Sequence, residues 1–159
     1  MTVGNNITVR YNLGEWLSLG GNFTKMDVLD NMKTAIGSSV PNLGYRENLP
    51  NLPSLFADFD ATFKWNGLWG KGNVLSLSYE GRFVEEFSYY SAKIGANKGD
   101  FMVPDQLSHN LALSYSVKNG RYNFSVVCNN ITDERLFDNF SLQKPGRAFY
   151  AKVRVRFGK

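Results

Sequence analysis

The chain has 159 residues, a net charge of +4 and a hydrophobic content of 43%, with 14% aromatic residues and 15 glycines. It contains no apolar run approaching the ~18 residues of a transmembrane helix, which excludes such a helix within it. Its basic residues are dispersed singly, which argues against nucleic-acid binding. The single cysteine, Cys128, cannot form an intrachain disulfide.

The first predicted element is a hairpin of two strands, over residues 5–12 and 16–25. Apolar Ile7 and Val9 alternate with polar neighbours in the first strand, and the second strand alternates in the same way. Alternation with a period of two is typical of a β-strand that presents one apolar and one polar face. A short turn at residues 13–15 closes the hairpin.

A second hairpin follows a loop over residues 27–53, which is longer than compact domains normally use and is therefore expected to be functional or mobile. Its strands are predicted over residues 55–65 and 73–83, on either side of a glycine-rich turn at residues 66–72. The first of these strands has one of the clearest alternations in the chain.

A third hairpin is predicted after another polar, aromatic loop at residues 88–104. Its strands cover residues 105–117 and 122–130, and the pair Asn119 and Gly120 between them favours a two-residue hairpin turn.

A seventh strand is predicted over residues 147–157, after a third long loop at residues 132–146. Its sequence, RAFYAKVRVRF, is apolar at every second position and mostly basic between. A length of about eleven residues is close to that of a tilted transmembrane β-strand.

The seven predicted strands are joined by connections that alternate between short and long. Bacterial outer-membrane barrels have short periplasmic turns and long extracellular loops. The sequence therefore predicts an all-β fold, an antiparallel up-and-down transmembrane β-barrel of which these are about seven strands.

The alternation by itself leaves open which face meets water. A soluble sandwich or lipocalin-like barrel would turn the apolar face inward. Aromatic residues beside the short turns favour lipid instead, because amphipathic rings at one level form an interfacial girdle. The residues of this predicted girdle are Tyr11, Trp16, Trp65, Trp69, Tyr115 and Tyr122.

The charged residues fix the orientation within a barrel. A lysine or arginine that faces the bilayer midplane costs roughly 2–4 kcal/mol, so the charged face is expected to line the lumen. The predicted lumen-facing residues are Asp58, Asp60, Lys64, Glu80, Arg82, Lys152, Arg154 and Arg156.

The predicted directions of the strands imply a larger barrel. If the last strand ends in the periplasm, the first begins outside, and a barrel whose N-terminus is also periplasmic needs an even number of strands. Seven strands also enclose too narrow a lumen for so many charges. The start of the chain does not resemble a signal peptide. We therefore expect residues 1–159 to be the C-terminal part of a longer polypeptide, the alternative being a cytosolic protein.

The last thirty residues resemble the C-terminal end of TonB-dependent outer-membrane receptors, especially those of Bacteroidetes. The resemblance is carried by the sequences NITD at residues 130–133, LFDNF at 136–140 and PGRAF at 145–149, and by the aromatic-ended final strand. The sequence NLPNLPSLF at residues 48–56 is similar to the family's re-entry into a mid-barrel strand.

The resemblance implies a barrel of twenty-two strands, closed by an N-terminal plug domain that is not present in this chain and energised through a TonB box. It implies TonB-energised uptake of a scarce ligand, a ferric siderophore or haem slightly more than a glycan, in the outer membrane of a Gram-negative bacterium. The expected partners are lipid, the TonB complex, the ligand and the barrel-assembly machinery. That machinery is expected to read Phe149, Val153, Val155 and Phe157.

Ligand contacts are expected from the long loops. Tyr89 and Tyr90 beside Lys93 and Lys98 combine aromatic and basic groups, which suits an anionic catecholate or haem. Arg46 and Arg135, the latter within an Asp133–Glu134–Arg135 cluster, are further candidates, although each of these residues also fits an ordinary solvated loop.

An enzyme is not expected. The only histidine, His109, shares a face with apolar residues, and no metalloprotease, serine-hydrolase or phosphate-binding motif occurs. No cofactor and no metal site are expected. Two other functions stay open, namely a passive or structural outer-membrane barrel and a soluble lipocalin-like binder.

Overall fold

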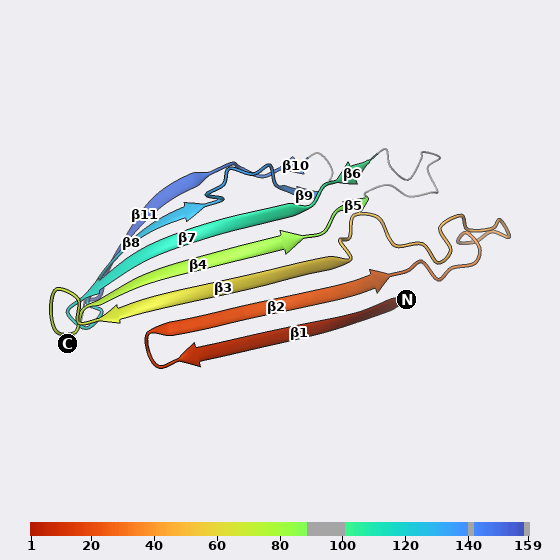
Figure 1. Cartoon of the computed structure of the whole chain (residues 1–159). Helices are drawn as coiled ribbons and strands as arrows, with labels where there is room; N and C mark the ends of the chain where they lie inside the picture. Colours follow the sequence, from red (N-terminus) through yellow and green to blue (C-terminus); the bar gives the residue numbers. More distant parts are fainter. Residues whose placement is uncertain (89–100, 140–141, 158–159) are drawn as a thin grey trace.

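The structure, a computed structural model, describes residues 1–88, 101–139 and 142–157. Seven strands form one antiparallel sheet in the order β1-β2-β3-β4-β7-β8-β11 (Figure 1). Their bounds are β1 Thr2–Leu13, β2 Leu17–Val28, β3 Leu55–Asn66, β4 Val74–Val84, β7 Gln106–Val117, β8 Tyr122–Asn129 and β11 Ala148–Val155. The predicted all-β class and the seven antiparallel strands are confirmed. The sheet is open, with β1 and β11 at its edges.

The connections lie at opposite ends of the sheet according to their length. The three short turns meet at one end, here called the turn end, and the three long connections meet at the other, the loop end (Figure 1). Two of the long connections contain small two-stranded ribbons that the sequence did not indicate, β5 Phe87–Ser88 with β6 Met102–Val103, and β9 Phe137–Asn139 with β10 Leu142–Gln143. The described residues contain no helix, and so no helix that could span a membrane.

The end of the last strand differs from the prediction. Strand β11 stops at Val155, which pairs with Tyr122, the first residue of β8. No residue of β8 remains to pair with Arg156 and Phe157, although the Arg156 amide still donates to the Arg121 carbonyl at 2.9 Å. The prediction that the strand reaches Phe157 was therefore wrong by two residues.

The pairing register keeps the two faces separate across the whole sheet. One cross-strand row reads Phe63, Leu77, Leu113, Val126 and Ala151. We call this side the apolar face and the other the polar face. All the charged residues predicted to share a face within the strands lie together on the polar face, because side chains of directly opposed residues point the same way.

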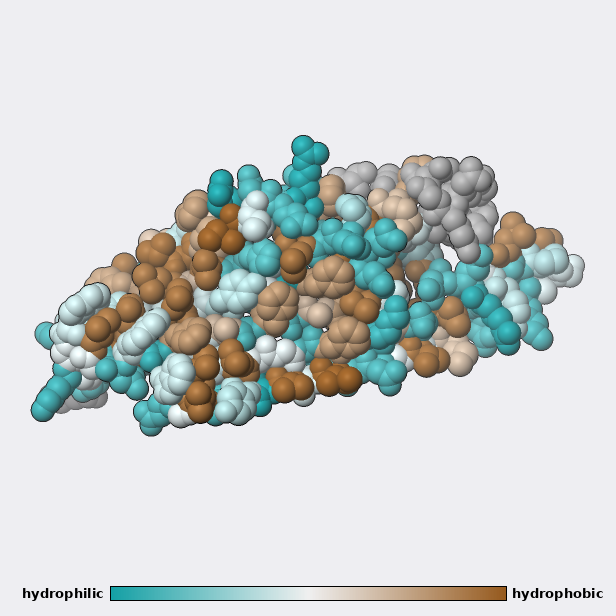
Figure 2. Space-filling view, viewed as in Figure 1, coloured by the Kyte–Doolittle hydropathy of each residue, from teal (hydrophilic) through white to brown (hydrophobic). Residues whose placement is uncertain are grey.

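Neither face is covered by a second layer of the described chain. The only buried hydrophobic residues in this part of the molecule are Phe87, Val103 and Cys128. On the apolar face, Phe149 is 70% exposed, Val126 56% and Leu113 47%. Figure 2 shows apolar side chains spread over the molecular surface along the middle of the strands. The sheet therefore has no hydrophobic core of its own.

Aromatic side chains gather at the turn end. Trp16 and Trp65 each lie 6.3 Å, centroid to centroid, from the Phe63 ring, and Trp69 meets Tyr115 edge to face at 5.4 Å. Trp16 and Trp69 lie in the turns themselves. The predicted girdle residues in the strands, Tyr11, Trp65, Tyr115 and Tyr122, all lie on the apolar face.

Asn73 ties two of the short turns together. Its side chain is nearly buried, at 8% exposure. Its Nδ2 donates to the Tyr115 hydroxyl at 2.9 Å and to the Trp69 carbonyl at 3.3 Å, and its Oδ1 accepts from the Lys118 amide at 3.2 Å. The turn before β4 is thereby fixed to the turn between β7 and β8.

We expect Asn73→Ala to lower the free energy of unfolding by about 1 kcal/mol, because the Lys118 amide and the Tyr115 hydroxyl lose a partner at a partly solvated site. Urea unfolding followed by tryptophan fluorescence measures the change. Asn66→Ala, which removes an exposed amide from the last residue of β3, is the matched control. Equal midpoints for the two variants would contradict the role assigned to Asn73.

Candidate functional site

The loop end of the polar face carries an ion pair between neighbouring strands. Asp58 on β3 and Arg82 on β4 are directly opposed, and Arg82 Nε lies 2.6 Å from Asp58 Oδ1. Both side chains are partly exposed, at 33% and 57%. Solvent screening limits the stabilisation by such a pair to at most about 1 kcal/mol.

The next row toward the turn end places two carboxylates face to face. Asp60 on β3 is opposite Glu80 on β4, and on its other side it is opposite Gly20 of β2. A Cβ atom at position 20 would lie 2.8 Å from the Asp60 Cγ. Glycine therefore leaves the space into which the Asp60 carboxylate leans.

Beside these charges lies a polar hollow, which we define as two adjoining depressions of about 170 and 350 Å³. Both depressions are lined by Arg82, Ser108, Leu136 and Lys144. The larger one adds amides and a carboxylate from the sheet, contributed by Glu80, Asn110, Asn129 and Asn130. Such a wall offers hydrogen-bond donors, acceptors and both signs of charge to a polar ligand.

The connection between β8 and β11 is closed by side-chain hydrogen bonds. Asn130, with a φ of 49°, directly follows β8 and exchanges bonds with Glu134, donating to its carbonyl at 2.8 Å and accepting from its amide at 3.1 Å. Asp133 Oδ1 accepts from the Arg147 amide at 2.7 Å. A Cβ at Gly146 would lie 2.6 Å from that same carboxylate oxygen. The NITD and PGR sequences thus form a clasp across the base of this loop.

We expect Asp133→Ala to loosen this clasp by about 1 kcal/mol, because alanine loses the bond to the Arg147 amide and is strained at the φ of 58° found here. Hydrogen exchange of the Arg147 amide measures the opening. Asp133→Asn keeps an acceptor oxygen and tolerates this φ, so its exchange should stay close to that of the unmodified protein. Faster exchange in both variants would contradict the clasp.

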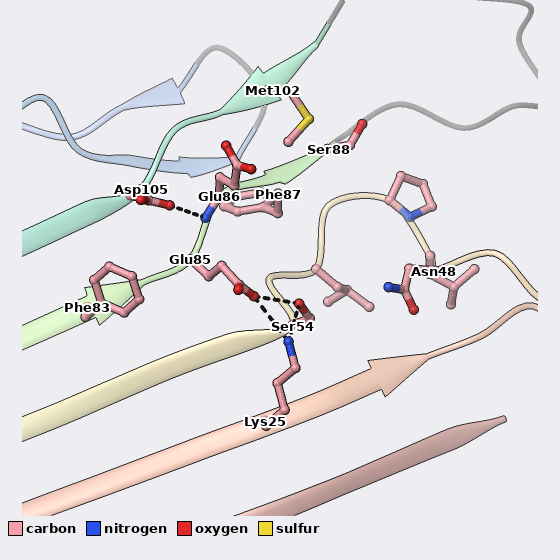
Figure 3. A pocket seen from close by; sticks show the side chains of 13 residues that line it. Lys25, Asn48, Ser54, Phe83, Glu85, Glu86, Phe87, Ser88, Met102 and Asp105 are labelled. Atoms are coloured by element: carbon pink, nitrogen blue, oxygen red, sulfur yellow. Dashed lines mark hydrogen bonds and ion pairs between the residues drawn. The ribbon is translucent and has the colours of Figure 1, made fainter. Parts of the chain in front are cut away.

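A second hollow, of about 610 Å³, lies at the loop end on the side of the apolar face (Figure 3). On its wall the Lys25 ammonium lies 3.4 Å from Glu85 Oε2, and the Ser54 hydroxyl donates to the same carboxylate at 2.7 Å. Asp105 accepts from the Glu86 amide at 2.8 Å. The cation in this hollow is therefore already paired.

Of the predicted ligand contacts, the structure describes only Arg46 and Arg135. Arg46 and Arg135 are exposed on different loops, and neither lines the polar hollow or the hollow around Lys25. The Arg46 guanidinium lies 5.6 Å from the ring centre of its neighbour Tyr45. The predicted contacts Tyr89, Tyr90, Lys93 and Lys98 lie outside the described residues.

The sequence analysis did not single out the residues that line the polar hollow from β7, β8 and the last loop. Ser108 and Asn110 were placed on the polar face by their parity, but nothing in the sequence marked them among other polar residues. Lys144, which pairs with Asp138 at 2.5 Å, reaches the hollow only because the last loop folds back over the sheet.

The described residues hold no group of three or more His, Cys, Asp and Glu side chains arranged for a metal ion. His109 lies on the apolar face, with its Nδ1 2.7 Å from the Tyr79 hydroxyl. That hydrogen bond satisfies two polar groups on the apolar face.

No protein-family model matches the chain, and no curated protein matches it. The function is therefore argued from the residues and their arrangement.

Proposed function

We propose that the chain forms part of the wall of a transmembrane β-barrel in the outer membrane of a Gram-negative bacterium, and that this barrel takes up a scarce ligand with energy supplied through TonB. The observation that carries the membrane location is the continuous apolar face, which no part of the described chain covers. Contiguous apolar surface of this extent is rare on soluble monomers.

The apolar face would be stable against lipid chains, whereas its exposure to water is unfavourable. Each neighbouring pair of the seven strands is joined by an antiparallel ladder, which satisfies the backbone groups between the strands as a bilayer demands. Strands of twelve residues are about 40 Å long, and a tilt of about 45° reduces this to roughly the 30 Å of the hydrocarbon core. The aromatic residues at the turn end suit the interface of such a bilayer.

The directions of the edge strands support a larger barrel. Six antiparallel junctions separate β1 from β11, so these two strands run the same way. An antiparallel barrel that includes this sheet needs an odd number of further strands between β11 and β1. Closure would also remove the two free edges, which otherwise invite association with other chains.

The uptake of a ligand is supported by the loop end. There the polar face, which would be the lumenal wall, forms the polar hollow beneath the long loops. The clasp supports the same proposal, because it is built from the residues that resemble the C-terminal end of TonB-dependent receptors. A ferric siderophore or haem is the proposed ligand, and a plug domain of the same polypeptide would contact the TonB complex.

Uptake of iron supplied as a ferric siderophore or as haem tests this proposal in cells that carry or lack the gene. We expect to recover the protein in the outer-membrane fraction. We also expect the iron uptake that depends on this gene to stop when TonB is deleted or the proton gradient is dissipated. Uptake that persists without TonB would contradict the energised mechanism. Recovery of the protein in the soluble fraction without detergent would contradict the membrane location.

A further inference from the structure

The turn end of the sheet carries cations that no nearby carboxylate of the described residues balances. Residues 65–79, 111–129 and 148–157, which contain the turn-end halves of β4, β7, β8 and β11, include no aspartate or glutamate. The exposed cations in or directly beside the turns before β4 and between β7 and β8 are Lys71, Lys118, Arg121 and Arg156. The acidic residue in the remaining short turn, Glu15, lies between β1 and β2 at the far edge of the sheet.

Two of these cations lie over one aromatic ring, and a third basic residue is joined to them through its backbone. The Lys118 Nζ lies 5.6 Å and the Arg121 Cζ 5.8 Å from the centre of the Tyr122 ring. The Arg156 amide donates to the Arg121 carbonyl at 2.9 Å, which brings a third basic residue beside them. We call Lys118, Arg121, Tyr122 and Arg156 the basic rim.

The basic rim continues directly into the apolar face. Tyr122, Phe124 and Val126 follow one another on that face of β8, and the last two are 47% and 56% exposed. Trp69 lies at the same end of the sheet. Its side chain is 77% exposed, and its ring packs edge to face against Tyr115. Cations at the end of an exposed apolar strip match an amphiphile with an anionic head.

We propose that the basic rim binds the headgroup of an anionic phospholipid, with its phosphate between Lys118 and Arg121 and its acyl chains over Phe124 and Val126. This rests on the proposed function, since it requires the apolar face to lie in a bilayer. A zwitterionic headgroup brings its own cation to the same place and gains less. Basic residues at a membrane surface each favour an anionic lipid by about fivefold.

Quenching of Trp69 fluorescence by brominated lipids tests the inference. The full protein is placed in nanodiscs that contain the same low fraction of brominated phosphatidylglycerol or brominated phosphatidylcholine, and the signal of Trp69 is isolated by subtraction of a Trp69→Phe variant. We expect phosphatidylglycerol to be preferred by about 25-fold, about fivefold for each of Lys118 and Arg121.

The double variant Lys118→Gln/Arg121→Gln should lose this preference. Lys118→Arg/Arg121→Lys, which keeps both charges, should retain it. The control is Lys64→Gln/Lys152→Gln, which removes the same charge from the polar face of the sheet and should also retain it.

Equal quenching by the two lipids, or the same preference in the Lys118→Gln/Arg121→Gln variant, would overturn the binding of an anionic phospholipid at the basic rim. Neither result would contradict the membrane location. No quenching by either lipid would overturn both, because Trp69 would then not lie at a bilayer.

Discussion

Replacement of Leu113 by arginine is expected to destabilise the protein in a bilayer by about 2–4 kcal/mol. Leu113 lies in the middle of β7, in the row between Leu77 and Val126, and its side chain is 47% exposed on the apolar face. In the proposed orientation this places the guanidinium near the bilayer midplane. Urea unfolding from lipid vesicles, followed by tryptophan fluorescence, measures the change.

The neighbouring residue provides a matched control. Ala112 precedes Leu113 on the same strand and points to the polar face, where its opposed residues Ser78 and Val127 carry no charge. Ala112→Arg should therefore cost under about 1 kcal/mol, because the guanidinium meets the lumen. Leu113→Ala separates the loss of packing from the cost of the charge. If the apolar face meets water, both arginine variants will unfold alike.

The second large loss of stability is expected when Gly81 is replaced by alanine. The Phe59 ring leans across Gly81 from the neighbouring strand, and a Cβ at position 81 would collide with several of its ring carbons. The ring is also held by Tyr79, at 5.8 Å between centroids, so it has little room to move. We expect the free energy of unfolding to fall by roughly 1–3 kcal/mol.

Gly21, on the other side of Phe59, provides the control for this prediction. It is opposite the same phenylalanine, but a Cβ there would meet only the Asp58 carbonyl oxygen, at 3.8 Å. Gly21→Ala should be neutral or slightly stabilising, because alanine reduces the entropy of the unfolded chain. The same urea titration serves both variants. Equal losses at positions 21 and 81 would contradict the packing of Phe59 over Gly81.

The strands, their pairing and their two faces could be predicted because each depends on local sequence. A slip of one residue would turn every side chain to the wrong face, so a continuous alternation also constrains the register. The alternation places Phe63 and Ala151 on one face and Asp58 and Arg82 on the other, whereas the structure shows which of these residues lie directly opposite one another.

The loop end could not be predicted in the same way, because its contacts join residues far apart in the chain. Lys144 lines the polar hollow together with Arg82 only because the last loop folds back. The clasp depends on positive φ angles at Asn130 and Asp133, which the sequence permits but does not require. The described ligand-contact candidates, Arg46 and Arg135, lie on separate loops, and the prediction for the other four residues stays a prediction.

The sequence by itself determined that this protein is a sheet of long antiparallel strands with one apolar and one charged face, because a period of two is a local property of the chain. Only the tertiary structure decided that the sheet is open and that no second layer of the described residues covers its apolar face. It also decided which turn-end cations meet around Tyr122. Closure and burial depend on how distant strands are placed relative to one another, and periodicity carries no information about that placement.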